Sequence, residues 1–288
     1  MSQVSHKTIS VIIVTHNSCP ALSFSLTALK RGMAEIPSEL IVVDNDSHDD
    51  SVEIVREIFP EARVLENDTN AGFARACNQG AKVAVGDYLL FHNPDLEIDS
   101  PAITEMLGVF AAREQVGAVA GRMRFPDGSF QPTCRNFPTW QNVIFSRGSA
   151  FSRLFGETRG YTLDDFSQVT EVPSVAGTLM MVERELFLSL GGFDERFFLY
   201  MEDTDLCLRL NRGGYRNYFV PEAGGVHLWG KGSDEGNFRR RWHHHLSVWK
   251  YFIKHFPNGF SLFILPVVLS ANFILTSLIS GSEGQSRE

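Results

Sequence analysis

The segment Asn70–Asp95, NAGFARACNQGAKVAVGDYLLFHNPD, joins a helix to a strand. Small residues in its first half predict a closely packed helix, and the apolar run that follows predicts a buried strand. Pro94 prevents the strand from continuing, so Asp95 is presented on a turn at the strand's carboxyl end. This pattern indicates the fold class, because a helix followed by a buried strand is one repeating unit of an α/β sheet.

The residues upstream repeat the same alternation. Apolar, β-branched runs predict strands at TISVIIVTH (8–16), ELIVVDNDS (39–47) and ARVLEN (62–67), with helices at 21–31 and 49–59 between them. This order is typical of a parallel sheet with helices on both faces, whose ligands bind at the carboxyl ends of the strands. Polar clusters stand at those ends, at 15–17, 44–47, 70–72 and 92–95.

Downstream of about Gly121 the pattern loosens, and 141–170 is expected to be an irregular loop. Regularity returns at 172–193, which predicts a strand and a helix, and at 213–233, which predicts a short strand followed by a glycine-rich loop. We therefore expect one domain over 1–240, in two halves of about 8–120 and about 121–240.

The composition excludes several classes of protein. The 288 residues carry a net charge of −8, which argues against a general nucleic-acid-binding protein. The four cysteines are far apart and form no C-x-x-C pair, so neither a zinc site nor a disulfide framework is expected, and a reducing cytosol fits best. The first strand lacks the G-x-G-x-x-G pattern, which argues against a dinucleotide enzyme.

The C-terminal residues 241–288 form a different kind of segment. Residues 259–282 contain no charged side chain, a length that could span a bilayer, and basic and aromatic residues precede them. This pattern favours a membrane-associating segment at the cytoplasmic face, either spanning the membrane or lying in its plane. The alternative is a hydrophobic helix that packs on the domain or at a homodimer interface.

The stretch FLYMEDTDLCLRL (198–210) holds three acids in four residues. If a helix begins near Glu202 and ends at the pair Gly213–Gly214, Asp203 faces inward with the apolar residues. Asp205 then points the opposite way, toward Arg209, as a solvated surface pair. The two aspartates would diverge and make a poor chelate. The alternative role for Asp203 is that of a helix N-cap.

Two further positions are candidates for a phosphate or cation site. Asp95 at the edge of a parallel sheet is well placed for a divalent cation on a diphosphate, although Asn93-Pro94-Asp95 is also a common turn. His227 precedes a loop that contains Lys231 and Ser233, and such a loop can wrap phosphates with its backbone N–H groups. A single histidine can equally be structural.

Together these segments resemble the family-2 glycosyltransferases with the GT-A fold, in the subgroup of bacterial rhamnosyltransferase-like and galactofuranosyltransferase-like enzymes. The matching stretches cover about residues 8–235 in the family's order. They are SVIIVTHNS, IVVDNDSHDDS, NAGFARACNQGAKVAVGDYLLFHNPD, VAGTLMMVERELFLSLGGFDERFFLYMEDTDLCLRLNRGGY and VHLWGKGS. The resemblance implies a Rossmann-like, mostly parallel central sheet flanked by helices, to which the C-terminal hydrophobic helical extension is added.

The resemblance also implies roles for individual residues. Asp95 matches the last metal ligand of an acid–x–acid motif, in which this sequence has Asn93 at the first position, and His227 matches a downstream metal ligand. Asp203 matches the catalytic base. Glu202 next to it has no role implied by the resemblance; it is a secondary candidate that orients either the acceptor or the start of the helix, and the alternative is an exposed surface residue. The implied nucleotide and donor residues are Thr15, Asn17, Asp44, Asp46, Arg75 and Asn78, so the half over about 8–120 would bind the nucleotide and the half over about 121–240 would hold the acceptor and catalytic residues. Lys231 joins the donor residues from the loop after His227, with Ser233 as a secondary candidate.

The implied reaction is an inverting transfer from a sugar nucleotide, with Mn²⁺ or Mg²⁺ on the diphosphate. The preferred reading is L-rhamnose from a dTDP-sugar, moved to a lipid-linked glycan intermediate at the inner face of the plasma membrane. The alternatives are a UDP-galactofuranose or other UDP-hexose transferase, and a catalytically silent sugar-nucleotide-binding scaffold. A nucleotidyltransferase would show a glycine-rich basic loop after the first strand, which THNSCPAL is not.

Overall fold

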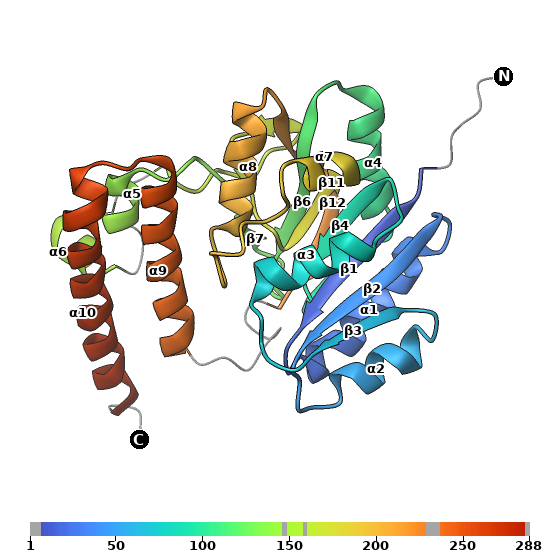
Figure 1. The fold of residues 1–288 in the computed structure, drawn as a ribbon, viewed down its shortest axis with the longest axis horizontal. Coiled ribbons are helices and arrows are strands. Elements are labelled where there is room, and N and C mark those ends of the chain that lie inside the picture. Colours follow the sequence, from blue (N-terminus) through green and yellow to red (C-terminus); the bar gives the residue numbers. More distant parts are fainter. Residues whose placement is uncertain (1–6, 146–148, 158–159, 229–236, 286–288) are drawn as a thin grey trace.

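A ten-stranded mixed sheet forms the centre of the protein (Figure 1). The computed structural model describes residues 7–145, 149–157, 160–228 and 237–285. The strand order is β3-β2-β1-β4-β11-β6-β12-β5, with β7 paired to β6 and β9 paired to β12. The bounds are β1 Ile9–Thr15, β2 Ser38–Asn45, β3 Arg63–Asn67, β4 Tyr88–His92, β5 Leu96–Ile98, β6 Val116–Arg124, β7 Phe130–Gln131, β9 Thr170–Val172, β11 Leu179–Glu183 and β12 Arg216–His227.

The first half of the sheet is parallel, as the sequence predicts. β1 pairs in parallel with β2 and β4, and β2 pairs in parallel with β3. β11 then enters antiparallel between β4 and β6, and β12 runs parallel to β6 but antiparallel to β5. The mostly parallel α/β sheet of the GT-A fold is therefore confirmed.

Helices cover both faces because the central strands alternate their side chains between two apolar layers. In β1, Ile9, Val11 and Ile13 join one core cluster, whereas Ile12 and Val14 join the other. The first cluster is covered by α1 Cys19–Met33, α2 Ser51–Ile58 and α4 Ala102–Ala112. The second is covered by α3 Phe73–Val83, α7 Arg184–Ser189 and α8 Glu202–Arg212.

The helix α8 begins and ends where the sequence predicts, but its acids are placed differently. Asp203 is buried as expected, and Asp205 pairs with Arg209 at 2.8 Å. Asp205 is nevertheless completely buried, so the prediction of a solvated surface pair is wrong. The face of α8 that local periodicity assigns to solvent is covered by α9, a helix from much later in the chain.

The C-terminal part of the chain is a helical hairpin. α9 spans Asn237–His255, a π-helical turn η1 follows at Phe260–Ile264, and α10 spans Leu265–Gln285. The two long helices lie side by side at one end of the molecule, next to the short helices α5 (Trp140–Ile144) and α6 (Ala150–Phe155) (Figure 1). They share a third apolar cluster with α8 and the loop before it, through Leu208 of α8 and Phe197 of that loop.

Candidate active site

Polar residues gather at the edge where the parallel strands end. β1 ends at Thr15, which lies opposite Asp44 of β2. On the other side of β1, β4 ends at His92 and leads into the turn that contains Asn93 and Asp95. The polar clusters expected from the sequence therefore share one edge of the sheet, as parallel pairing requires.

The loops after β1 and β2 are tied to each other and to the buried Asp44. Asp44 accepts hydrogen bonds from the backbone N–H of Ser47, at 3.0 Å, and from its hydroxyl. The Asn17 N–H donates to the Ser47 hydroxyl at 3.0 Å, and Asn17 and Asp46 both adopt positive φ, at 52° and 64°. The buried Thr15 hydroxyl has no partner among the described residues, which fits a ligand at this edge.

Asp95 and His227 are brought together by the antiparallel pairing of β5 with β12, although 132 residues separate them in the chain. The Nε2 atom of His227 lies 3.1 Å from Oδ1 of Asp95 and 3.4 Å from Nδ2 of Asn93. On the other side of the ring, Nδ1 is 2.8 Å from Oε1 of Gln131. A proton on Nδ1 satisfies Gln131 and leaves the Nε2 lone pair directed at Asp95, which is the arrangement that a metal ligand needs.

This pair fits a cation that is shared with a substrate. Within the described residues, His, Cys, Asp and Glu side chains form no group of three or more that could hold a metal ion. One carboxylate and one imidazole would leave the remaining positions to phosphate oxygens and water, which is how Mg²⁺ and Mn²⁺ are usually held on nucleotides.

Asp203 lies in the first turn of α8, and its carboxylate is fixed from two sides. Oδ2 accepts from the backbone N–H of Gly177 at 3.0 Å, and Oδ1 accepts from the N–H of Thr204 at 2.6 Å. The N-cap position belongs to Met201, so the N-cap alternative for Asp203 is wrong. The next residue after Gly177, Thr178, accepts from the Asn93 N–H at 2.9 Å, which places Asp203 at the same edge as the Asp95 turn.

Glu202, the neighbour of Asp203, is a buried acid of a different kind. Its burial raises the pKa of the carboxyl group well above the usual range, and the nearby charge of Asp203 adds to that effect. Oε2 has no hydrogen-bond partner in the described part of the chain. Burial therefore favours the protonated form of Glu202 more than it would be favoured in an exposed glutamate.

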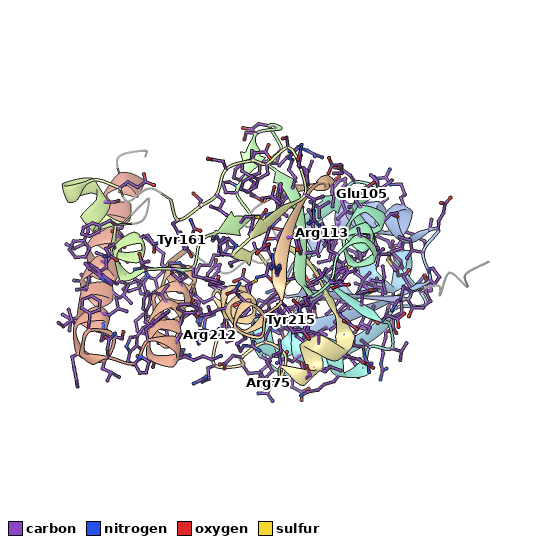
Figure 2. All side chains as sticks on the ribbon, turned by 90° about the horizontal axis from the view of Figure 1, so that it is seen from above. Arg75, Glu105, Arg113, Tyr161, Arg212 and Tyr215 are labelled. Carbon is purple, nitrogen blue, oxygen red and sulfur yellow. The ribbon has the colours of Figure 1, made fainter. Side chains whose placement is uncertain are left out.

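Two functional candidates, Arg135 and Tyr161, were not singled out by sequence reasoning. β8 (Cys134–Arg135) pairs with β10 (Ser174–Val175), which brings Arg135 close to Asp203. Burial alone would lower the pKa of Arg135, but Tyr161 and Asp203 raise it above the ordinary value, so the guanidinium stays charged. Tyr161 lies between the sheet and the C-terminal helices (Figure 2). The turn-rich sequence around Arg135 gives no sign of this β-pairing.

The remaining predicted donor residues are placed as follows. Arg75 on α3 is mostly exposed, and its Nε lies 4.0 Å from Glu195. Asn78 is buried, and its amide accepts from the N–H of Phe193 at 2.9 Å and donates to its carbonyl at 2.8 Å. Its described contacts therefore hold the loop before α8. Lys231 and Ser233 lie outside the described residues.

The site combines polar loops at the edge of a mostly parallel sheet, an Asp–His pair, and a buried aspartate on a nearby helix. This combination is that of a glycosyltransferase of the GT-A class. The chain belongs to glycosyl transferase family 2, whose model matches residues 10–191. A second model, glycosyl transferase family group 2, matches residues 133–282 and so reaches into the C-terminal hairpin. The protein is therefore an enzyme of an inverting glycosyltransferase family.

Two relatives carry rhamnosyltransferase names. The N-acetylglucosaminyl-diphospho-decaprenol L-rhamnosyltransferase of Mycobacterium tuberculosis is 29% identical over 236 residues, which cover 75% of each chain. The rhamnosyltransferase WbbL of Escherichia coli is 30% identical over 142 residues, which cover 49% of this chain and 52% of that protein.

Solved structures support the fold. The mannosyltransferase PcManGT from Pyrobaculum calidifontis, in complex with GDP-Man and Mn²⁺, aligns over 97% of this chain and 76% of its own, with a TM-score of 0.61 and 19% identity. GalNAc-T7, with UDP, GalNAc and Mn²⁺, aligns over 84% of this chain and 48% of its own, with a TM-score of 0.61 and 17% identity.

Proposed function

We propose that this enzyme transfers L-rhamnose from dTDP-rhamnose to a lipid-linked glycan during synthesis of a cell-surface polysaccharide. The observation that carries the transfer reaction is the buried Asp203 carboxylate, held by Gly177 and Thr204 at the sheet edge that also bears the Asp95–His227 pair. The choice of rhamnose and of a lipid-linked acceptor is supported by the names of the two relatives.

The residues at the edge of the sheet have separate proposed roles toward the base and the diphosphate of the donor. Asp44, with oxygen lone pairs beyond those used by Ser47, accepts from the N–H of the pyrimidine base. Asp95 and His227 would hold a divalent cation, which would supply positive charge to offset the negative charge on the leaving diphosphate.

Asp203 is the general base of the proposed transfer. It takes the proton of the acceptor hydroxyl while that oxygen forms its bond to the anomeric carbon and the bond to the diphosphate breaks. A single displacement inverts the configuration at that carbon, so no second carboxylate is needed as a nucleophile. The charged guanidinium of Arg135 lies close to Asp203 and offers hydrogen-bond donors to the acceptor, and Glu202 is the residue next to Asp203 in the first turn of α8.

A panel of dTDP- and UDP-sugars, each with and without Mn²⁺, tests this function. We expect dTDP-rhamnose to be consumed fastest, with release of dTDP. Preference for a UDP-sugar would instead favour the runner-up, a UDP-galactofuranose or UDP-hexose transferase; UDP is the nucleotide in the GalNAc-T7 structure. No turnover with any donor, together with no binding of any pyrimidine nucleotide, would contradict both the dTDP-rhamnose and the UDP-sugar transferase hypotheses. Nucleotide binding without turnover would indicate a silent scaffold.

We further propose that residues 1–240 are the catalytic domain and that 241–288 attach it to the cytoplasmic face of the plasma membrane. Phe260–Ser277 is long and apolar enough to cross a membrane, and only 22% of it is buried within the protein. The exposed apolar side chains include Phe263, at 73%, and Val267, at 67%. We favour a membrane over packing on the domain because these large apolar side chains are exposed.

Replacing Phe263 and Val267 together by glutamate is expected to weaken binding to phospholipid vesicles by at least about tenfold. Each substitution puts a charge where an apolar side chain would enter the bilayer, at a cost of a few kcal/mol (~2–3) near its centre. Co-sedimentation with vesicles measures the change. Val85→Glu is the matched control, because Val85 is 78% exposed on the catalytic domain. Unaltered sedimentation of the double variant would show that this face does not contact lipid.

A further inference from the structure

The loop 194–201, which leads into α8, has a backbone that is unfavourable without external support. Tyr200 and Met201 both have positive φ, at 68° and 70°, immediately before Glu202 and Asp203. L-residues rarely adopt this left-handed region, and such a conformation persists only where surrounding contacts hold it. The position of Asp203 therefore depends on what fastens this loop.

The helix α3 fastens one side of the loop. The amide of Asn78 holds both backbone groups of Phe193, at 2.9 and 2.8 Å. Further along, the N–H of Phe73 donates to the carbonyl of Phe198 at 2.8 Å. These bonds fix the start and the middle of the loop, but they do not reach Tyr200 or Met201.

The helix α9 fastens the other side. Its contacting side chains follow helical spacing along one face: His243, Ser247, Lys250, Lys254 and His255. The ring of His243 stacks on Phe198 at 4.4 Å, and the hydroxyl of Ser247 donates to the carbonyl of Leu199 at 2.8 Å. Lys250 donates to the carbonyl of Arg196 at 2.5 Å. α9 thus follows the loop over most of its length.

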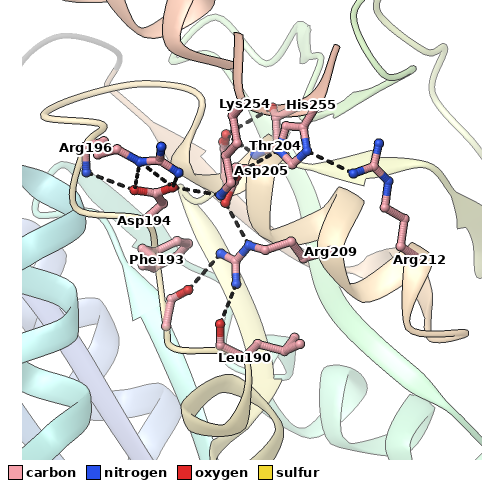
Figure 3. Close-up of polar contacts among 12 residues, drawn as sticks. Leu190, Phe193, Asp194, Arg196, Thr204, Asp205, Arg209, Arg212, Lys254 and His255 are labelled. Carbon is pink, nitrogen blue, oxygen red and sulfur yellow. Dashed lines mark hydrogen bonds and ion pairs between the residues drawn. The ribbon is translucent and has the colours of Figure 1, made fainter. Parts of the chain in front are cut away.

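The strongest of these contacts converge on Asp205, which is completely buried (Figure 3). Its carboxylate accepts from Arg209 at 2.8 Å, from Lys254 at 2.5 Å and from His255 at 2.7 Å. Burial alone raises the pKa of Asp205, but the His255 bond and the charges of Arg209 and Lys254 outweigh it and lower the pKa. Arg212 donates to Nδ1 of His255, so the proton that His255 shares with Asp205 sits on Nε2.

Lys254 spans the two ends of the loop. Its ammonium group donates to Asp205 in α8 and also, at 2.7 Å, to Asp194 at the start of the loop (Figure 3). Asp194 is further bound by Arg196, at 2.6 Å. Removal of the ammonium group would therefore take one charged contact from each end of the loop at once, while Arg209 and His255 still bind Asp205 and Arg196 still binds Asp194.

We propose that Lys254, through Asp205 and Asp194, is a positioning residue for Asp203, so that the C-terminal hairpin sets the geometry of the catalytic base. This inference rests on the proposed role of Asp203 as the base. Lys254 touches neither substrate nor cation; it acts by holding the loop and the first turns of α8 in place. The hairpin is then part of the catalytic apparatus as well as the membrane-facing segment.

Lys254→Met in the full chain is the direct test, with dTDP-rhamnose as donor and dTDP as binding probe. The kcat is expected to fall ~10–100-fold, because small displacements of a catalytic group have effects of this size. The KM for the donor and the affinity for dTDP with Mn²⁺ should stay near wild type, because the sheet edge that binds them is untouched. Lys254→Arg should restore most of the kcat. Lys82→Met, at an exposed lysine of α3, is the matched control.

Hydrogen exchange supplies a readout that does not need turnover. The amides of 196–203 are expected to exchange faster in Lys254→Met than in Lys82→Met, with the central strands unchanged. If Lys254→Met fails to fold, Ser247→Ala, which removes one hydroxyl from the same face, should show a smaller effect in the same direction. Wild-type kcat and wild-type exchange in a folded Lys254→Met would overturn the inference. A wild-type enzyme that consumes no donor would instead overturn the proposed function, and the exchange result would still decide the positioning role.

Discussion

Asp203→Asn is expected to abolish sugar transfer while nucleotide binding persists. The amide oxygen of asparagine can still accept from Gly177 or Thr204, so the first turn of α8 keeps its place. It cannot take up the proton of the acceptor hydroxyl. A general base contributes roughly 10²–10⁴-fold to the rate, so kcat should fall by about that factor. Initial rates of dTDP release and calorimetric binding of dTDP with Mn²⁺ measure the two quantities separately.

Glu202→Gln is the informative comparison, because it changes the neighbouring acid in the same way. Burial raises the pKa of Glu202 and so favours its neutral form, which the amide of glutamine resembles, and the loss in kcat should stay below about tenfold. Asp164→Asn, at an exposed loop carboxylate, controls for the substitution itself. If Glu202→Gln were the inactive variant and Asp203→Asn the active one, the assignment of the base would have to be exchanged.

The local pattern of the sequence was sufficient to predict the helix α8 and the burial of Asp203. A 3.6-residue period and a glycine pair define a helix from Glu202 to Arg212, because both signals depend only on nearby residues. The same period predicted that Asp205 is exposed to solvent, and this prediction was wrong. The residues that cover it and donate hydrogen bonds to it, Lys254 and His255, follow about 50 positions later. Periodicity shows which residues share a face of a helix but not what covers that face.

The other parts of the site depended on pairing between distant strands. The four parallel strands and their polar ends could be predicted, because each is a short apolar run that ends in a turn. The meeting of Asp95 with His227 needs β5 beside β12, and the approach of Arg135 to Asp203 needs β8 beside β10. The family resemblance implied the first meeting, whereas nothing in the residues around Arg135 indicated the second.

Removal of divalent cations with a chelator is expected to stop turnover, and Mn²⁺ is expected to restore it. Asp95 and His227, the two proposed ligands, lie 3.1 Å apart and both are buried, so they are already placed before a nucleotide arrives. His227→Ala removes the nitrogen ligand and should raise the Mn²⁺ concentration for half-maximal activity by about 10–100-fold, the size of effect typical even of groups that only support a ligand. Titration of chelator-treated enzyme with Mn²⁺ at saturating dTDP-rhamnose measures this.

Gln131→Leu separates a metal role of His227 from a structural one. The Oε1 atom of Gln131 lies 2.8 Å from Nδ1 of His227, on the side of the ring away from Asp95. Its loss removes the hydrogen bond that favours a proton on Nδ1, but it leaves the imidazole in place. If His227 binds the cation, Gln131→Leu should shift the Mn²⁺ titration in the same direction as His227→Ala but by less, and excess Mn²⁺ should rescue both variants. If His227 only stabilises the fold, thermal stability should fall in both variants and added Mn²⁺ should restore neither. Full activity of the wild-type enzyme after complete chelation would contradict the cation site itself, since the diphosphate would then leave without the charge that Asp95 and His227 are proposed to hold in place.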